Sequence, residues 1–525
     1  MQFRVLNHDS WVPDTGRDTA YLKIDRWNDF SFVTMFSLSF HDREGVLHKI
    51  GDVKIGFKGQ TEDIPTYKKL PNTFEDLDES YFSLGDGLEF YKKMRDIPDS
   101  KAMLLALRDI VQNPAIIETI SEESVFGTSL LRSQSLSIVK GQYSRVLKGG
   151  VELTDFNFKF VRPATDTFGG LDLNFNVDAE SIPSTNIHAI IGRNGAGKTT
   201  LLNGMIQAIT NKANSQGKFY ETAWYGDQDI GTDYFSSLVS VSFSAFDPFP
   251  PPPEQSDPAK GTCYFYVGLK NQKNINSHKA IDELHLDCAS ALLKCFQEGE
   301  KSKRWLSAIE KLGSDDNFSS MRLERLQSYF LERIQDDYNS FDYVDAKQKY
   351  YSLVKPLLSE MSSGHAIVLL TITELVSKVE EKTLVLLDEP ESHLHPPLLS
   401  AFIRALGDLL HDRNGVAIIA THSPVVLQEI PKLCVWKIFR KGKNVQNERP
   451  KIETFAENVG VLTSEVFSLE VERSGFHSLL AASVASGKNY HEILSDYNNN
   501  LGFEGRAILK AMIADRERGD TNDEN

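Results

Sequence analysis

The feature that most constrains the fold is the glycine-rich segment 192–200, which reads GRNGAGKTT. An apolar, strand-like run, residues 187–191, precedes it, and the helix-like run LLNGMIQAI follows it. The spacing G-x-x-x-x-G-K-[ST] is that of a phosphate loop, whose backbone N–H groups wrap around phosphates at conformations that glycine adopts most easily. The N-terminus of the helix that follows adds partial positive charge. The segment therefore predicts a strand, a phosphate-binding loop and a helix in succession.

The residue types of this loop predict separate roles. The Lys198 ammonium would reach the β- and γ-phosphates of a nucleoside triphosphate, and the Thr199 hydroxyl would ligate Mg²⁺. We expect the whole loop to contact ATP, through Gly192, Arg193, Asn194, Gly195, Ala196, Gly197, Lys198, Thr199 and Thr200.

Two further polar groups follow apolar runs. Asp388 and Glu389 end the run 383–387, TLVLL, and His422 follows the run 416–420, VAIIA. Ligands of parallel α/β sheets bind at the carboxyl ends of the strands, where these side chains are expected. The prediction is that Asp388 holds Mg²⁺, that Glu389 acts as the general base toward water, and that His422 contacts the γ-phosphate.

Composition restricts the class of protein. The 525 residues carry a formal net charge of −16, which argues against a chain that coats nucleic acid over its whole surface. No apolar run is long enough to span a membrane, no signal peptide is visible at the N-terminus, and four scattered cysteines form no disulfide framework. These observations predict a soluble, cytoplasmic protein.

The chain is expected to be of the α/β class, in three parts. Residues 1–145 form an accessory α+β region with a hairpin over 32–40 and 46–57, residues 146–455 form the ATPase domain, and residues 456–525 form a helical region with a polar tail. A helical insertion, or lid, is predicted at about 255–355, after the proline cluster 248–253.

The order of these motifs resembles an ABC-type ATPase. That family has a signature loop before the helix leading to the Asp-Glu pair, and Ser362, Ser363 and Gly364 stand in its place here. The resemblance implies a head with an inserted lid, in which two protomers sandwich two molecules of ATP with Mg²⁺ and Ser362 contacts the nucleotide of the partner. The chain is thus expected to form at least a homodimer.

The segment 390–396, PESHLHP, is similar to that of the soluble branch that contains RecF, OLD and SMC-like proteins. The family's loop glutamine has no clear counterpart, and Ser242 and Ser244 are both candidates for its place. His393 and His395 are interpreted as loop residues of the family rather than as metal ligands, and Cys288 and Cys295 as core residues of a helix rather than zinc ligands.

The segments 458–469, 470–479 and 501–516, with the N-terminal extension, resemble the PtuA ATPases of Septu-type and retron-associated antiphage systems. That resemblance implies an ATP-hydrolysing regulator of a separate HNH nuclease, with DNA or retron RNA/DNA reached through the partner complex and no membrane involved. The alternative is a RecF-like repair ATPase that binds DNA directly. The basic run 437–451 is either a DNA contact or a solvated hairpin.

Overall fold

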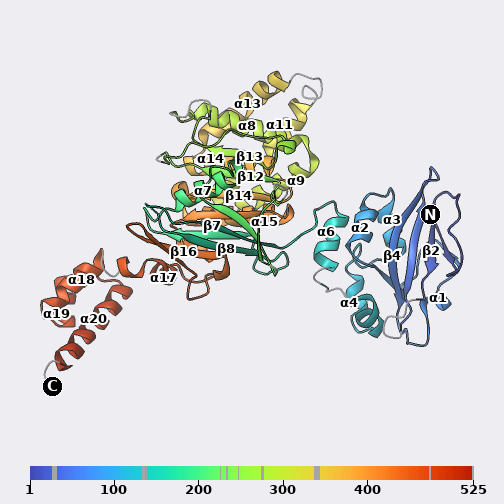
Figure 1. Cartoon of the computed structure of the whole chain (residues 1–525), viewed down its shortest axis with the longest axis horizontal. Helices are drawn as coiled ribbons and strands as arrows, with labels where there is room; N and C mark the ends of the chain where they lie inside the picture. Colours follow the sequence, from blue (N-terminus) through green and yellow to red (C-terminus); the bar gives the residue numbers. More distant parts are fainter. Residues whose placement is uncertain are drawn as a thin grey trace. The chain divides into compact units, whose positions relative to one another are not determined.

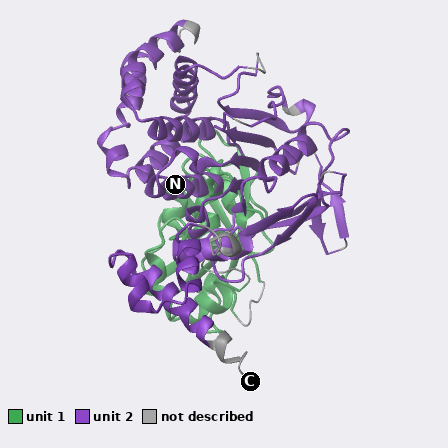
Figure 2. Cartoon of the chain, turned by 90° about the vertical axis from the view of Figure 1, so that its left-hand side faces the viewer, with its two compact units in different colours: residues 1–155, 411–414 green, residues 156–410, 415–525 purple. Residues whose placement is uncertain are grey.

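The computed structural model of the chain describes residues 1–26, 32–132, 136, 139–166, 168–224, 226–231, 234–245, 247–272, 277–335, 343–471 and 475–522. The chain divides into two compact units, which Figure 2 colours separately. Unit 1 comprises residues 1–155 and 411–414, and unit 2 comprises residues 156–410 and 415–525. The three predicted domain boundaries stay predictions, and all the predicted site residues lie in unit 2.

Unit 1 contains a six-stranded sheet in the order β5-β1-β2-β3-β4-β6. β3 and β4 pair antiparallel, so the predicted hairpin is confirmed, whereas the parallel pairing of β1 with β2 was not foreseen. The strands are β1 (Gln2–Leu6), β2 (Thr19–Ile24), β3 (Met35–His41), β4 (Leu47–Phe57), β5 (Thr73–Phe74) and β6 (Tyr81–Gly85).

Short helices pack against this sheet, and the two share an apolar core that includes Phe40, Phe82 and Leu104. The α-helices are α1 (Thr66–Lys69), α2 (Leu88–Arg95), α3 (Ser100–Ala106), α4 (Ile116–Ile120) and α6 (Ser144–Leu147), and η1 (Phe126–Leu130) and η2 (Val139–Tyr143) are π-helical turns.

Unit 2 is organised around a seven-stranded sheet in the order β13-β12-β14-β15-β9-β16-β17, parallel except for the β16–β17 hairpin. Its central strands are continuously buried, as expected for a parallel sheet covered on both faces. The predicted α/β class is therefore confirmed. The strands are β9 (Ile187–Gly192), β12 (Ser237–Ser242), β13 (Cys263–Gly268), β14 (Thr383–Asp388), β15 (Val416–Thr421), β16 (Val435–Lys441) and β17 (Asn444–Glu448).

One face of this sheet packs against α7 (Lys198–Thr210) and a smaller antiparallel sheet. Phe158 and Phe175 of the small sheet, Leu201 of α7 and Leu386 of the large sheet belong to one apolar cluster. The small sheet has the order β11-β10-β7-β8. Its strands are β7 (Phe156–Arg162), β8 (Leu171–Val177), β10 (Lys218–Ala223) and β11 (Gly226–Asp229).

Helices cover the other face, in the largest apolar cluster of the described residues. Figure 1 shows α8, α9, α11, α13 and α14 gathered together in yellow to yellow-green. The predicted insertion holds most of these helices, but it also contributes β13 to the edge of the sheet. The helices are α8 (Ile281–Gln297), α9 (Gly299–Leu312), α10 (Asp316–Ser320), α11 (Arg325–Arg333), α13 (Tyr343–Glu360), α14 (Ser363–Lys378) and α15 (Pro396–Asp412).

The helix α15 connects the parallel neighbours β14 and β15, which confirms the predicted βαβ unit. Its first residue is Pro396, a residue favoured at that position because the N–H it lacks has no partner inside a helix. Leu398, Phe402, Ala405 and Leu409 recur every three or four residues and are buried, so this face holds α15 against the sheet.

One short helix follows β15, and the helices after the β16–β17 hairpin agree with the predicted helical C-terminal region. Leu480, Ile493 and Leu509 form a small separate core among the last three helices. Among the described residues, no helix combines the length and apolar character that crossing a membrane requires. The helices after β15 are α16 (Pro424–Gln428), α17 (Val459–Val471), α18 (Phe476–Ala485), α19 (Tyr490–Asp496) and α20 (Phe503–Asn522). Elsewhere in unit 2, the 3₁₀ turns are η3 (Pro258–Lys260), η4 (Pro390–His393) and η5 (Lys432–Cys434).

Candidate functional site

The phosphate loop joins the end of β9 to the start of α7. Gly195 and Gly197 have φ values of +80° and +95°, in the left-handed region that glycine adopts most readily. A Cβ at Gly197 would lie 2.8 Å from the Phe168 ring, and one at Gly192 would lie 2.4 Å from the Ile438 carbonyl oxygen. The backbone path itself thus requires these glycines, and it curls around the N-terminus of α7 as a phosphate cradle does.

Lys198 is the first residue of α7, and only 4% of it is exposed. Its Nζ donates to the carbonyl oxygens of Gly192, at 3.0 Å, and Arg193, at 3.3 Å. The same atom lies 3.5 Å from Oε1 of Glu389. The ammonium is therefore held inside the loop, within reach of whatever anion the loop surrounds.

Asp388 ends β14 beside the phosphate loop. Burial raises the pKa of its carboxyl to about 6, with the charges of Glu389 and Asp247 acting in the same direction, while a hydrogen bond with Thr199 opposes the shift. Its Oδ1 is buried without a hydrogen-bond partner. Because Mg²⁺ prefers oxygen ligands, a buried carboxylate oxygen without a partner next to a threonine hydroxyl suits this cation. The residues predicted to hold Mg²⁺ thus lie together.

Glu389 lies between Lys198 of the phosphate loop and His422. Its φ of +46° is unusual for a residue with a side chain, and its backbone N–H donates to the Ala420 carbonyl at 2.8 Å. Its Oε1 lies 3.6 Å from Nδ1 of His422. The pKa of Glu389 is lowered, chiefly by His422 and then by Lys198, and pairing with Glu389 raises the pKa of His422. The carboxylate is thus kept ionised, as a general base must be.

Glu391 organises residues 421–423, at the end of β15, and the sequence did not point to it. Its Oε1 accepts from the Thr421 hydroxyl at 2.5 Å, from the His422 backbone N–H at 2.6 Å and from that of Ser423 at 3.2 Å. Nδ1 of His422 lies 3.1 Å from the same oxygen. The signal was a third carboxylate in the run DEPE, two residues after the predicted base.

A cavity lies beside the predicted magnesium ligands, lined among others by Thr199, Ser242, Asp247 and Asp388. Ser242 pairs in register with Asp388 across β12 and β14, and its hydroxyl is buried without a hydrogen-bond partner. Asp247 lies in the loop after β12 and pairs with Lys270 at 2.9 Å. Of the two serines weighed for the place of the missing glutamine, Ser242 lines this cavity, and Asp247 is a further polar group there that the sequence reasoning did not name.

The signature residues Ser362, Ser363 and Gly364 form the start of α14. Ser362 is the N-cap: its Oγ accepts the His365 backbone N–H at 3.4 Å and lies 2.7 Å from Nδ1 of His365. A Cβ at Gly364 would lie 2.5 Å from the His393 carbonyl oxygen. Both serines are exposed, and together they form the N-terminus of α14. Of the three signature residues, Gly364 thus packs on the loop after β14, and the two serines are open to solvent.

A second cavity, of about 510 Å³, opens on the other side of the phosphate loop. Arg193, Asn194, Gly195 and Ala196 line it together with residues of the β16–β17 hairpin. Thr200, the remaining loop residue of the prediction, lies in the first turn of α7.

The basic run forms the β16–β17 hairpin, and whether it contacts DNA stays open. Two of its basic side chains are held internally. Lys437 is 3% exposed and pairs with Glu448 and Glu465, and Arg449 stacks on the Trp436 ring at 3.7 Å. Arg440 and Lys441 are exposed and border the 510 Å³ cavity, so this part of the hairpin faces the phosphate loop.

The cysteine interpretation is also confirmed. Cys288 and Cys295 are free, buried residues of α8, and burial raises the pKa of both thiols. His393 is exposed in η4, while His395 pairs with Asp315, which the sequence did not predict.

Known protein families match the part of the chain that carries these residues. One family model, described as "AAA domain, putative AbiEii toxin, Type IV TA system", matches residues 298–428, and a second, described as "AAA domain", matches residues 166–361. Between them they include the phosphate loop, the signature residues, Asp388, Glu389 and His422. The chain therefore contains a P-loop domain of the AAA type.

The family follows from a full-length relative. The chain is 51% identical to protein ea59 of Escherichia phage lambda over 527 residues, which cover 99% of each protein. The chain belongs to the ea59 family.

Three solved structures resemble parts of the fold. MJ1267, an ATP-binding cassette of an ABC transporter in its ADP conformation, is 15% identical, with 61% of this chain and 99% of that chain covered and a TM-score of 0.32. UvrA2 from Deinococcus radiodurans is 15% identical, and the match covers 62% of this chain and 42% of UvrA2, with a TM-score of 0.29. An Smc head bound to the C-winged helix domain of ScpA is 11% identical, and the match covers 56% of this chain and 97% of the Smc head, with a TM-score of 0.26.

Proposed function

We propose that the chain is an ATP-hydrolysing switch. The observation that carries this proposal is the approach of both Lys198 and His422 to Glu389 where the parallel strands end. These are the cation, the base and the phosphate sensor that cleavage of a γ-phosphate needs, at the edge of the sheet where ligands bind.

Each residue of the site has its own role in the proposed reaction. The loop N–H groups and Lys198 bind the β- and γ-phosphates, the substrate anion replacing the carbonyl oxygens that Lys198 now contacts. Thr199 and Asp388 would hold Mg²⁺, which screens the charge of the phosphates when bound. Glu389 orients the attacking water and takes its proton, and His422, aligned by Glu391, donates toward the γ-phosphate oxygens.

The exposed signature residues support a dimer of two copies of this chain. Ser362, Ser363 and the N-terminus of α14 offer a hydroxyl pair and partial positive charge that suit the γ-phosphate of a nucleotide on the facing protomer. Each ATP is then sandwiched between one phosphate loop and the signature loop of the second copy.

Two variants test the switch. Glu389→Gln should bind ATP normally, lose turnover by about 10²–10⁴-fold and accumulate a closed dimer with Mg-ATP, measured by sedimentation velocity. The double variant Lys198→Ala/Glu389→Gln is the control and should remain unable to close, because it lacks the ammonium that binds the phosphates. Equal hydrolysis by Glu389→Gln and the unmodified chain would overturn the assignment of the base.

The finer proposal is that closure controls a separate HNH nuclease in antiphage defence, as in PtuA of Septu-type systems, in the cytoplasm and with DNA or retron RNA/DNA reached through the partner complex. The sequence resemblance at the two ends of the chain supports it. Co-expression with the product of the adjacent reading frame should give a stable complex whose nuclease activity differs between the unmodified chain and Glu389→Gln. A partner without an HNH motif, or activity indifferent to the variant, would contradict this part of the proposal.

A second candidate is a RecF-like ATPase that binds DNA directly. The observation that favours it is the group of exposed basic side chains on the hairpin, Arg440, Lys441 and Lys443, of which the first two border a cavity that the phosphate loop also lines. Direct binding to phosphates would weaken steeply with salt, and each lost cation would reduce the slope of log K against log salt by about 1. Salt-dependent DNA binding by the isolated chain that Lys441→Ala weakens would favour this candidate over the nuclease regulator.

A further inference from the structure

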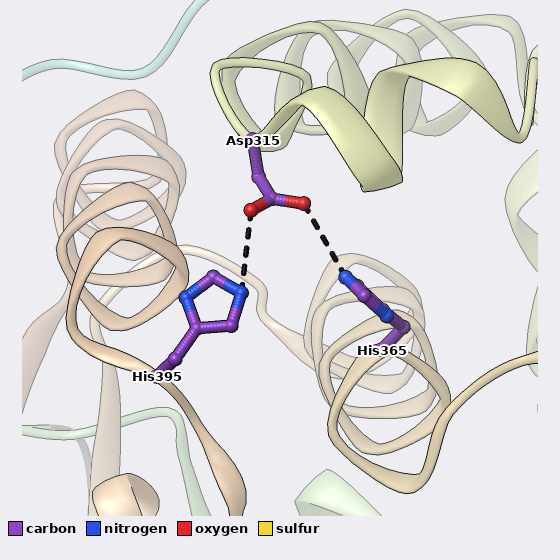
Figure 3. A group of neighbouring side chains, drawn as sticks. All are labelled: Asp315, His365 and His395. Carbon is purple, nitrogen blue, oxygen red and sulfur yellow. Dashed lines mark hydrogen bonds and ion pairs between the residues drawn. The ribbon is translucent and has the colours of Figure 1, made fainter.

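Three side chains that are distant in the sequence converge beside the signature loop. Asp315 is the N-cap residue of α10, His365 lies in the first turn of α14, and His395 immediately precedes α15. Figure 3 shows the Asp315 carboxylate between the two imidazoles. Nε2 of His365 lies 3.3 Å from Oδ1, and Nε2 of His395 lies 3.3 Å from Oδ2. One ligand atom from each residue lies within 4.8 Å of the others.

We propose that Asp315, His365 and His395 bind a divalent transition-metal ion of the Zn²⁺ class. Two imidazole nitrogens and one carboxylate oxygen are a common ligand set for such ions, whereas Mg²⁺ and Ca²⁺ prefer oxygen ligands alone. Ligands about 2.0–2.1 Å from a tetrahedral zinc ion lie about 3.3–3.4 Å from each other. Each imidazole lies at about this distance from its own oxygen of the Asp315 carboxylate, so each pair of atoms has the separation of neighbouring zinc ligands. Both separations are longer than the roughly 2.7–2.9 Å typical of strong charge-assisted hydrogen bonds.

The surroundings fix the ligands in place. The Phe318 backbone N–H donates to Oδ1 of Asp315 at 2.9 Å, which sets the orientation of the carboxylate. Nδ1 of His365 lies 2.7 Å from the Ser362 hydroxyl, which can accept its N–H while Nε2 faces the metal. Outer contacts of this kind set the ring orientation and tautomer of metal-binding histidines.

His395 is the adjustable ligand. Its Nδ1 accepts the Leu398 backbone N–H at 3.3 Å, and a metal on Nε2 would place a proton on Nδ1 and so replace that long hydrogen bond with one to water. The side chain is 46% exposed, whereas those of Asp315 and His365 are 9% and 10% exposed. Solvent can therefore reach both this imidazole and the fourth coordination position.

The site joins three functional segments. The metal would tie the lid, through Asp315, to the loop after Glu389, through His395, and to the helix that carries Ser362, through His365. The metal site itself stands on the three ligand residues alone. Its consequence, a signature loop held ready for the facing nucleotide, rests on the proposed function.

The test is a titration of the full-length, chelator-treated and nucleotide-free chain with Co²⁺, followed through its visible absorption, and then with Zn²⁺ as competitor. We expect one Co²⁺ per chain, displaced by Zn²⁺. Asp315→Asn and His395→Ala should each weaken binding by at least about 100-fold, beyond the effect of losing an outer partner. His395→Ala alters an exposed side chain, so it keeps the test valid if the buried Asp315 variant fails to fold.

The matched control is His393→Ala, which removes the other histidine of the same exposed loop and should bind Co²⁺ like the unmodified chain. Sub-stoichiometric binding, equal binding by His395→Ala, or preference for Mg²⁺ over Co²⁺ would overturn the proposed site. Because metal binding is measured without nucleotide, it is independent of ATP turnover. A Glu389→Gln variant that fails to close as a dimer would contradict the switch and leave the metal result intact.

Discussion

The Glu391 carboxylate holds His422 at two points: Oε1 accepts the backbone N–H of His422 at 2.6 Å and lies 3.1 Å from Nδ1 of its ring. The Glu391 side chain is only 6% exposed. It therefore links the loop after β14 to the end of β15, and this link fixes the position of the proposed phosphate sensor, His422, relative to the loop that carries the proposed base, Glu389.

The first prediction concerns this link. Glu391→Ala should lower kcat for ATP hydrolysis by about 100-fold, because a displacement of His422 by about 1 Å costs that much, while the Kd for ATP changes little. Glu391→Gln keeps an acceptor for the backbone N–H groups and should lose less. A fall in ATP affinity that matches the fall in kcat would show that Glu391 supports the fold of the nucleotide site and does not position His422.

The second prediction concerns Asp247. If its carboxylate supports the Mg²⁺ site next to Asp388, Asp247→Asn should raise the Mg²⁺ concentration for half-maximal ATPase activity by about 10–100-fold. Lys270→Gln is the control, because it breaks the 2.9 Å ion pair and leaves the Asp247 carboxylate in place. The same change in Mg²⁺ dependence in both variants would assign the effect to the ion pair and contradict a role in metal binding.

The third prediction concerns the glycine of the signature loop. Gly364→Ala should lower stability by about 1–3 kcal/mol, because its Cβ would lie 2.5 Å from a backbone carbonyl that has to move. Gly299→Ala, at the start of α9, is the matched control: no atom lies within 4 Å of the added methyl group, so the change should be neutral or stabilising. Urea unfolding of both variants measures the difference. Equal stability of Gly364→Ala and Gly299→Ala would show that the η4 backbone moves away from the added methyl group at little cost in free energy.

The sequence was informative where chemistry depends on local order. A glycine-rich loop between a strand and a helix, and polar residues directly after apolar runs, placed Lys198, Asp388, Glu389 and His422 correctly at one edge of the sheet. This succeeds because parallel neighbouring strands end together, so that residues distant in the chain become neighbours once the strands are recognised.

The sequence was uninformative where a site depends on how separate segments pack. Asp315 belongs to the lid, and nothing in its neighbourhood predicts that it meets His365 and His395. Asp247 directly precedes the proline cluster 248–253, and nothing in that segment predicts that it lies beside Asp388 in the folded chain. Likewise, the parallel pairing of β1 with β2 follows from the register of a whole sheet rather than from any local pattern.

The last prediction concerns His188, the second residue of β9, whose ring is fully buried against Phe175 and whose two nitrogens have no hydrogen-bond partner. Burial lowers its pKa from 6.5 to about 3. Above pH 6.5 the imidazole is neutral in both the folded and the unfolded chain. As the pH falls below 6.5 only the unfolded chain binds a proton, so the free energy of unfolding decreases, by about 1.4 kcal/mol for each pH unit down to the folded pKa.

His188→Val removes this imidazole, so the free energy of unfolding should decrease less as the pH falls. Relative to the unmodified chain, its free energy of unfolding should rise by roughly 2 kcal/mol between about pH 7 and about pH 5, measured by urea unfolding at both values. The exposed His393→Val is the control and should keep the unmodified dependence on pH, because it removes a surface histidine and leaves the buried His188 ring in place. If His188→Val and the unmodified chain lose stability in parallel on acidification, the buried imidazole takes up its proton without unfolding, through solvent that reaches the sheet beneath the phosphate loop.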